Sequence, residues 1–126
     1  MAQSDSSETG VVRLKTRPQF LFVRAGSTER RKSVVVQARQ RKGSELIGAG
    51  FTATKKIGNA VVRNRAKRRM REAASRLLPL HGRRGADYVF IARMETATIG
   101  WQRLLDDMES ALISVAEDFS AGTGPA

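Results

Sequence analysis

The chain has 126 residues, no cysteine, a formal net charge of +11 and a sequence pI of about 11.4. This length favours one domain with a single core, and the lack of cysteine excludes disulfides and thiolate metal sites. A charge of this size says little about the fold but indicates polyanionic partners. No apolar run approaches the ~18 residues that span a bilayer, and the first residues are polar and acidic, unlike a signal peptide. We therefore expect a cytoplasmic protein that does not enter a membrane.

The charge is unevenly distributed along the chain. Residues 1–10 have a net charge of −2, residues 11–94 of +18 and residues 95–126 of −5. The two ends, 1–10 and 120–126, bury too little apolar area to offset the cost of ordering, so we predict disordered tails there. A single domain is expected over residues 11–119.

The domain begins with a short predicted helix and two strands. Pro18 and Gly26 bracket a helix over about 18–24, and a β-branched run predicts a strand over 33–38. A second strand, over about 46–54, alternates strictly between two faces. Its apolar face carries Ile47, Ala49, Phe51 and Ala53, and its small, polar face carries Gly48, Gly50, Thr52 and Thr54. The small face is expected to leave room for a bound group.

The second half of the domain alternates helix, strand and helix. Asn59 is a predicted N-cap and Pro79 with Gly82 a predicted end, so the central helix is expected over about 59–78. A strand is expected over 86–92, followed by an amphipathic helix from Trp101 to Phe119. The apolar stripe of the central helix consists of Val62, Ala66, Met70, Ala73 and Leu77. This order of elements predicts an α+β sandwich, with helices packed on a small sheet.

The central helix carries the most concentrated charge. Residues 55–76 hold nine Lys or Arg, seven of them between Arg63 and Arg76, and Glu72 is the only acid. A solvated helix face would normally balance such charges with acids at i,i+4. Cations in the first half of a helix also oppose its dipole, and the arginine fork matches phosphate. We therefore favour a nucleic-acid-binding surface over a plain solvated face.

The residue pattern alone does not decide between DNA and RNA. No heptad zipper follows Leu78, and the sequence shows no helix-turn-helix pair and no zinc-finger spacing. The strands also lack the RNP1 sequence, with its aromatic residues, that marks an RNA recognition motif.

Catalytic residues are not evident in the sequence. The one histidine, His81, is expected in a polar loop, and Asp106 and Asp107 on a solvated helix face. The sequence has no second histidine, no cysteine and no phosphate-binding loop. It therefore offers no set of residues that could perform acid–base or metal-dependent catalysis. We expect no catalytic residue and no metal site, so this chain is predicted to bind rather than to react.

Three segments resemble a known family. The stretch KKIGNAVVRNRAKRRMRE at 55–72 closely resembles the signature of bacterial ribonuclease P protein subunits, with its Arg-Asn-Arg core at 63–65. The segment RLKTRPQF at 13–20 is similar to the family's opening, and ADYVFIAR at 86–93 to its last strand. The similarity extends from about 13 to 119, and the 55–71 motif is long enough to be highly specific.

The resemblance implies a two-layer sandwich of αβββαβα topology with a left-handed βαβ crossover. It implies an accessory subunit, in which a catalytic RNA uses Mg²⁺ to cleave the 5′ leader from precursor tRNA; neither DNA nor a protein oligomer is implied. The implied RNA-binding residues are Lys55, Lys56, Arg63, Asn64, Arg65, Lys67, Arg68 and Arg71. A cleft between the sheet and the first helix would hold the single-stranded leader at Phe20, Gly50, Thr52 and Thr54.

This chain departs from the family at one position, and two alternative functions remain open. Some family members place an aromatic residue on the first strand where this chain has Gln37, so leader stacking at that point is not expected. The alternatives are a ribosomal-type structural RNA-binding protein, which would assist no reaction, and an intrinsic nuclease, which the missing catalytic groups disfavour.

Overall fold

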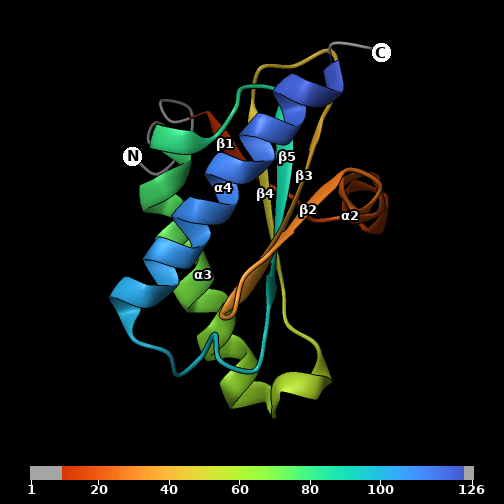
Figure 1. Ribbon diagram of the computed structural model, residues 1–126. Coiled ribbons are helices and arrows are strands. Elements are labelled where there is room, and N and C mark those ends of the chain that lie inside the picture. Colours follow the sequence, from red (N-terminus) through yellow and green to blue (C-terminus); the bar gives the residue numbers. More distant parts are fainter. Residues whose placement is uncertain (1–9, 124–126) are drawn as a thin grey trace.

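A computed structural model describes residues 10–123 of the chain. Three α-helices and a short 3-10 turn are interleaved with five strands (Figure 1). The helices are α2 (Arg17–Arg24), α3 (Ala60–His81) and α4 (Trp101–Thr123), and the turn is η1 (Lys55–Ile57). The strands are β1 (Val11–Arg13), β2 (Ser27–Arg30), β3 (Val34–Gln40), β4 (Ile47–Thr52) and β5 (Ala86–Ala92).

One sheet organises the domain, with its strands in the order β1-β4-β5-β3-β2. Strand β4 runs parallel to both β1 and β5, whereas β3 is antiparallel to both β5 and β2. Because β4 and β5 are parallel neighbours, the chain must cross over between them, and α3 makes this crossover. The basic segment therefore lies in the connection between β4 and the central strand β5.

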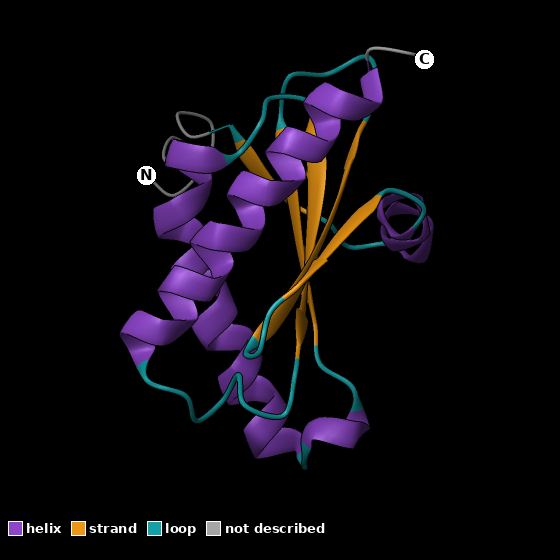
Figure 2. Cartoon of the chain, in the orientation of Figure 1, coloured by secondary structure: helices purple, strands orange, loops and turns teal. Residues whose placement is uncertain are grey.

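The helices cover the two faces of the sheet unequally. Helices α3 and α4 lie on one face and α2 on the other, as Figures 1 and 2 show. The larger core includes Met70 of α3, Tyr88 and Phe90 of β5 and Met108 of α4, all fully buried. The smaller core joins Leu14 and Val23 to Val89 of β5, with Phe20, Phe22 and Ile91 packed against it.

The expected α+β fold and its order of elements are confirmed. The implied αβββαβα order is observed with β1 added before the first helix, and β2 is the one of its strands that the residue pattern did not predict. Helix α2 forms a smaller layer on the sheet face opposite α3 and α4. Helix α4 continues to Thr123, so the prediction of a disordered tail is wrong for residues 120–123. Residues 1–9 and 124–126 of the predicted tails lie outside the described residues.

Three local expectations differ from the structure. Helix α3 ends at His81 rather than at Leu78, with Pro79 inside its last turn. His81 is thus helical, and its Nε2 lies 2.8 Å from Oε2 of Glu109 on α4. Asp107 is not simply solvated, because its Oδ2 accepts a hydrogen bond of 2.8 Å from the Ser33 hydroxyl.

No helix in the described part of the chain is both long and apolar enough to cross a membrane.

Candidate nucleic-acid interface

A tight turn places the two lysines after β4 beside the start of α3. Gly58 has a φ of +148°, and a Cβ there would lie 2.9 Å from the Cβ of Val62, so this turn requires glycine. The side chain of Asn59 then accepts a hydrogen bond of 3.0 Å from the Val62 backbone N–H, which makes it the predicted N-cap. As a result Lys55 and Lys56 of η1, both exposed, lie next to the first turn of α3.

The apolar stripe of α3 determines where its cations point. Ala66, Met70, Ala73 and Leu77 are buried and Val62 is half-buried, as predicted. Since the stripe faces the core, the remaining positions of the helix face outward or lie at the flanks. Arg63, Lys67 and Arg71 are half-buried at one flank, and Asn64, Arg65 and Arg68 are exposed.

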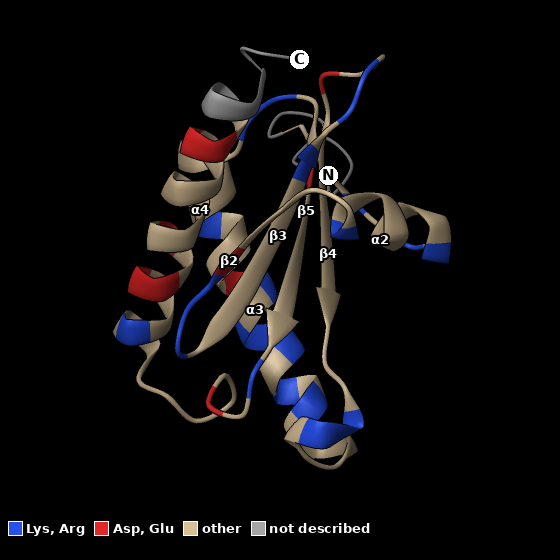
Figure 3. Cartoon of the chain, turned by 45° about the vertical axis from the view of Figure 1, so that its right-hand side comes forward, with Lys and Arg blue, Asp and Glu red and all other residues tan. Residues whose placement is uncertain are grey.

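These residues and the two lysines of η1 form a basic group, which we call the cation set. Figure 3 shows Lys and Arg gathered at η1 and along the first half of α3, and acidic residues along α4. The cation set comprises the predicted RNA-binding residues Lys55, Lys56, Arg63, Asn64, Arg65, Lys67, Arg68 and Arg71.

The cations of this set lack partners within the described part of the chain. None of the seven forms an ion pair there, and Nε of Arg63 is buried without a hydrogen-bond partner. The first turn of α3 has no acid, and the helix dipole disfavours a cation near this end, such as Arg63, by ~0.3–1 kcal/mol at low salt. An external anion would relieve this unfavourable arrangement.

Two arginines of the same helix do have partners. Arg69 donates from Nη1 to the carbonyl oxygen of Thr96 at 2.6 Å, and from Nη2 to that of Ile99. Burial, together with nearby Arg65, lowers the pKa of Arg69. Arg76 pairs with Glu72 at 3.3 Å, and its guanidinium lies 5.4 Å from the ring centre of Trp101. Arg69 and Arg76 are thus committed to the fold and are distinct from the cation set.

The residues implied for the leader cleft, which we call the leader set, are only partly brought together. A Cβ on Gly50 would lie 2.6 Å from Cε1 of Phe20, so the half-buried Phe20 ring covers this glycine. Thr52 is half-buried one step further along the same strand face, and Thr54 is exposed beyond the end of β4. The room expected beside Gly50 is therefore filled by the chain's own Phe20, and the surface left open starts at Thr52.

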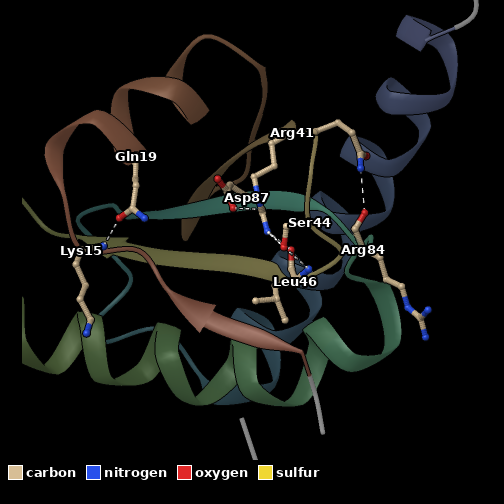
Figure 4. Close-up of polar contacts among 8 residues, drawn as sticks. Lys15, Gln19, Arg41, Ser44, Leu46, Arg84 and Asp87 are labelled. Atoms are coloured by element: carbon tan, nitrogen blue, oxygen red, sulfur yellow. Dashed lines mark hydrogen bonds and ion pairs between the residues drawn. The ribbon is translucent and has the colours of Figure 1, made fainter. Parts of the chain in front are cut away.

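A part-buried ion pair lies at the other end of this face. The Arg41 guanidinium pairs with the Asp87 carboxylate on β5, and Arg41 also donates to Ser44 and to the Leu46 carbonyl (Figure 4). Burial raises the pKa of Asp87, while Arg41 acts in the opposite direction. A Cβ on Gly48 would lie 2.1 Å from Oδ1 of Asp87, so only glycine fits beside the pair. The pair holds the β3–β4 loop against the sheet and removes Arg41 from the free cations.

This ion pair was not predicted from the sequence, although a signal for it was present. A glycine inside a strand often marks a close approach by another group, and Gly48 and Gly50 lie two residues apart on one face. Asp87 and Leu14 approach Gly48, whereas Phe20 approaches Gly50.

A mixed α+β domain that presents a helix of unpaired cations has the electrostatic footprint of a nucleic-acid-binding protein. The family model described as Ribonuclease P matches residues 10–116. A ribonuclease P protein component of Caulobacter vibrioides is 55% identical over 111 residues, which are 87% of this chain and 74% of that protein. One from Ruegeria pomeroyi is 46% identical over 114 residues, covering 88% of this chain and 91% of that protein.

Solved structures agree with these relatives. The RNase P protein of Staphylococcus aureus matches with a TM-score of 0.69 at 27% identity, covering 82% of this chain and 94% of that one. The RNase P protein from Thermotoga maritima matches with a TM-score of 0.69 at 25% identity, covering 82% and 96%. The chain belongs to the ribonuclease P protein family. The expectation of a protein component that acts in tRNA 5′ maturation together with an RNA subunit is thereby confirmed.

Proposed function

We propose that the cation set binds the RNA subunit of ribonuclease P, and that this RNA performs the catalysis. The observation that carries the proposal is that all seven cations lack a carboxylate partner among residues 10–123, although Arg69 and Arg76 of the same helix have partners. Guanidinium groups bind phosphate oxygens through two parallel hydrogen bonds. The phosphates of an RNA would provide the missing negative charge.

The proposal assigns the 5′ leader of precursor tRNA to the leader set. Phe20 is half-buried over Gly50, and Thr52 pairs in register with the half-buried Ile91, which itself pairs with Val35 of β3. The open surface is thus a sheet face with an aromatic side chain at its border. One base stacked on such a side chain contributes ~1–3 kcal/mol. Gly50 acts indirectly, because its missing side chain lets the Phe20 ring lie against the strand.

The proposal places Mg²⁺ with the RNA. Among residues 10–123 no three His, Asp or Glu side chains come together in a way that suits a metal ion. These residues therefore do not fit a dedicated magnesium cage, and Mg²⁺ commonly takes phosphate oxygens and waters as ligands instead. The role of this chain is to neutralise phosphates and to hold the substrate.

The acid–base groups of the described chain also support catalysis by the RNA. His81 lies at the last turn of α3, at the opposite end of the helix from the cation set, and contacts Glu109. No second histidine exists in the sequence.

We also propose that the protein is located in the cytoplasm, and the absence of cysteine supports this location.

The test is cleavage of precursor tRNA in Mg²⁺ by the protein alone, by the RNA subunit alone, and by both together. We expect no cleavage by the protein alone, and cleavage by the RNA that the protein accelerates at low salt. Arg65→Ala and Arg68→Ala should lose this acceleration while their circular dichroism stays unchanged.

Each remaining outcome contradicts one part of the proposal. Cleavage by the protein alone would make the chain a nuclease in its own right. An RNA reaction that the protein leaves unchanged would favour a purely structural RNA-binding role. Loss of helical signal in Arg65→Ala or Arg68→Ala would show that these side chains support the fold instead.

A further inference from the structure

A cavity of about 420 Å³ lies between the sheet edge at β1 and β4 and the side of α3. It is separate from the leader set, because its β4 residues Ala49 and Phe51 point to the core face rather than to the face of Gly50. Its size falls within the ~300–1,000 Å³ of small-ligand sites. The apolar residues that line its interior belong neither to the cation set nor to the leader set, so no role has yet been assigned to them.

The lining combines an apolar floor with a cationic rim. Ala49, Phe51 and Leu78 contribute the floor, and Arg13, Arg68 and Arg71 line the rim. The Phe51 ring is stacked on Phe90 at 5.3 Å between ring centres and remains half-buried rather than fully covered. An aromatic side chain in reach of several arginines is the combination with which proteins bind single-stranded nucleic acid.

One carboxylate also lines the cavity, and its charge is offset. Glu72 pairs with Arg76 at 3.3 Å. The three arginines of the rim form no ion pair among the described residues, so the cavity mouth keeps a net positive charge. An anionic group is therefore favoured at the mouth and an uncharged, planar group inside.

We propose that this cavity binds one unpaired nucleotide of an RNA that lies on the cation set. The base would occupy the apolar floor beside Phe51, and its phosphate would lie between Arg13, Arg68 and Arg71. Arg68 and Arg71 belong to both the cation set and the rim, so a strand bound along α3 reaches the cavity directly. This inference rests on the proposed function and adds Arg13 and Phe51 to the RNA-contacting residues.

The test fills the cavity without altering a cation. Ser75 is exposed on α3 and lines the cavity, so Ser75→Leu places apolar atoms in it at little expected cost to the helix. Gln102→Leu, at an exposed position of α4 outside the cavity, is the matched control. Phe51→Leu removes the aromatic ring and keeps an apolar side chain, and thermal melts check that each variant is folded.

The probes are a short oligouridine, which offers unpaired bases, and a blunt RNA duplex, which offers only phosphates. We expect Ser75→Leu and Phe51→Leu to weaken oligouridine binding about tenfold, the scale of one lost base stack. Duplex binding should stay within about twofold, as should both affinities of Gln102→Leu. Phe20→Leu, which alters the leader set, controls for stacking at that second aromatic side chain.

Oligouridine carrying 4-thiouridine locates the base directly. A photo-crosslink to the peptide that contains Phe51, lost in Ser75→Leu, is the expected result. If both variants bind oligouridine as tightly as the unaltered chain, or if the crosslinks map to Phe20 alone, the cavity is not a nucleotide site although the proposed function stands. If the unaltered chain binds neither probe, the proposed function fails as well.

Discussion

Nη1 of Arg69 donates a hydrogen bond of 2.6 Å to the carbonyl oxygen of Thr96, which ties the middle of the most basic helix to the loop before α4. This arginine shares its segment with the cation set but not its role. Arg68, the preceding residue along the chain, is exposed and has no ion pair in the described structure. The two neighbours therefore offer a matched comparison between an arginine of the fold and one of the interface.

Arg69→Ala should destabilise the domain by about 1.5–3 kcal/mol, because hydrogen bonds from a charged group contribute on this scale. Arg68→Ala should change stability by less than about 0.5 kcal/mol, as is usual for an exposed side chain without partners. Urea denaturation followed by circular dichroism measures both. Equal stabilities of the two variants would contradict the division of roles.

Gly50→Ala should destabilise the domain by about 1–3 kcal/mol, since the new Cβ would lie 2.6 Å from Cε1 of Phe20 and the site has no spare volume. A double variant with Phe20→Leu should recover part of the loss, because the close contact is removed. A double-mutant cycle in urea measures this coupling. Strict additivity of the two changes would show that Phe20 does not press on Gly50.

Asp87 should make stability depend on pH in the weakly acidic range. Burial raises its pKa above the ordinary 3.8, so the folded state binds its proton more tightly than the unfolded state. The free energy of unfolding should therefore fall as pH rises from about 3.8 through the raised value, by no more than about 1.4 kcal/mol per pH unit.

Asp87→Asn should remove this slope. Urea midpoints of the unaltered chain and the variant, measured across the acidic range, isolate the Asp87 contribution as their difference. If the unaltered chain instead gained stability over the variant as pH rose, attraction to Arg41 would outweigh burial, and the expected sign of the slope would be wrong.

Much of the fold was predictable because its largest elements have strong local patterns. The stripe of α3 and the Asn59 cap are encoded within a few turns, and both are confirmed. Strand β1 has three residues and pairs in parallel with β4, and β2 is the polar stretch STER paired with β3. Neither has an alternating apolar pattern, so pairing defines each as a strand: β1 with the distant β4, and β2 with β3, which follows it directly in the chain.

The end of α3 shows how a local rule is overridden. Proline was expected to end the helix, but Pro79 lies in its last turn, where its missing N–H leaves only the carbonyl of Ser75 without an intrahelical donor. Both residues are exposed, so water can serve that carbonyl. The Gly82 N–H donates to the Leu78 carbonyl at 2.7 Å and closes the helix instead.

The positive charge of the site was predictable from the sequence, but the role of each arginine was not. The arginines from Arg63 to Arg76 look alike in sequence, and tertiary contacts separate those that stabilise the fold from those that stay unpaired among the described residues. Arg69 and Arg76 reach α4 and the loop before it, through Thr96, Ile99 and Trp101. These contacts join residues about thirty positions apart, so no local pattern reveals them.

The salt dependence of binding to the RNA subunit tests the role of the cation set most directly. The logarithm of the binding constant should fall linearly with the logarithm of salt concentration, by ~0.7–0.9 for each phosphate that a cation neutralises. Arg65→Ala and Arg68→Ala should each lower this slope by about one phosphate equivalent, whereas Arg76→Ala, whose guanidinium is paired with Glu72, should leave it unchanged. A flat salt profile, or an equal loss of slope in all three variants, would contradict the claim that the unpaired cations of α3 hold the RNA.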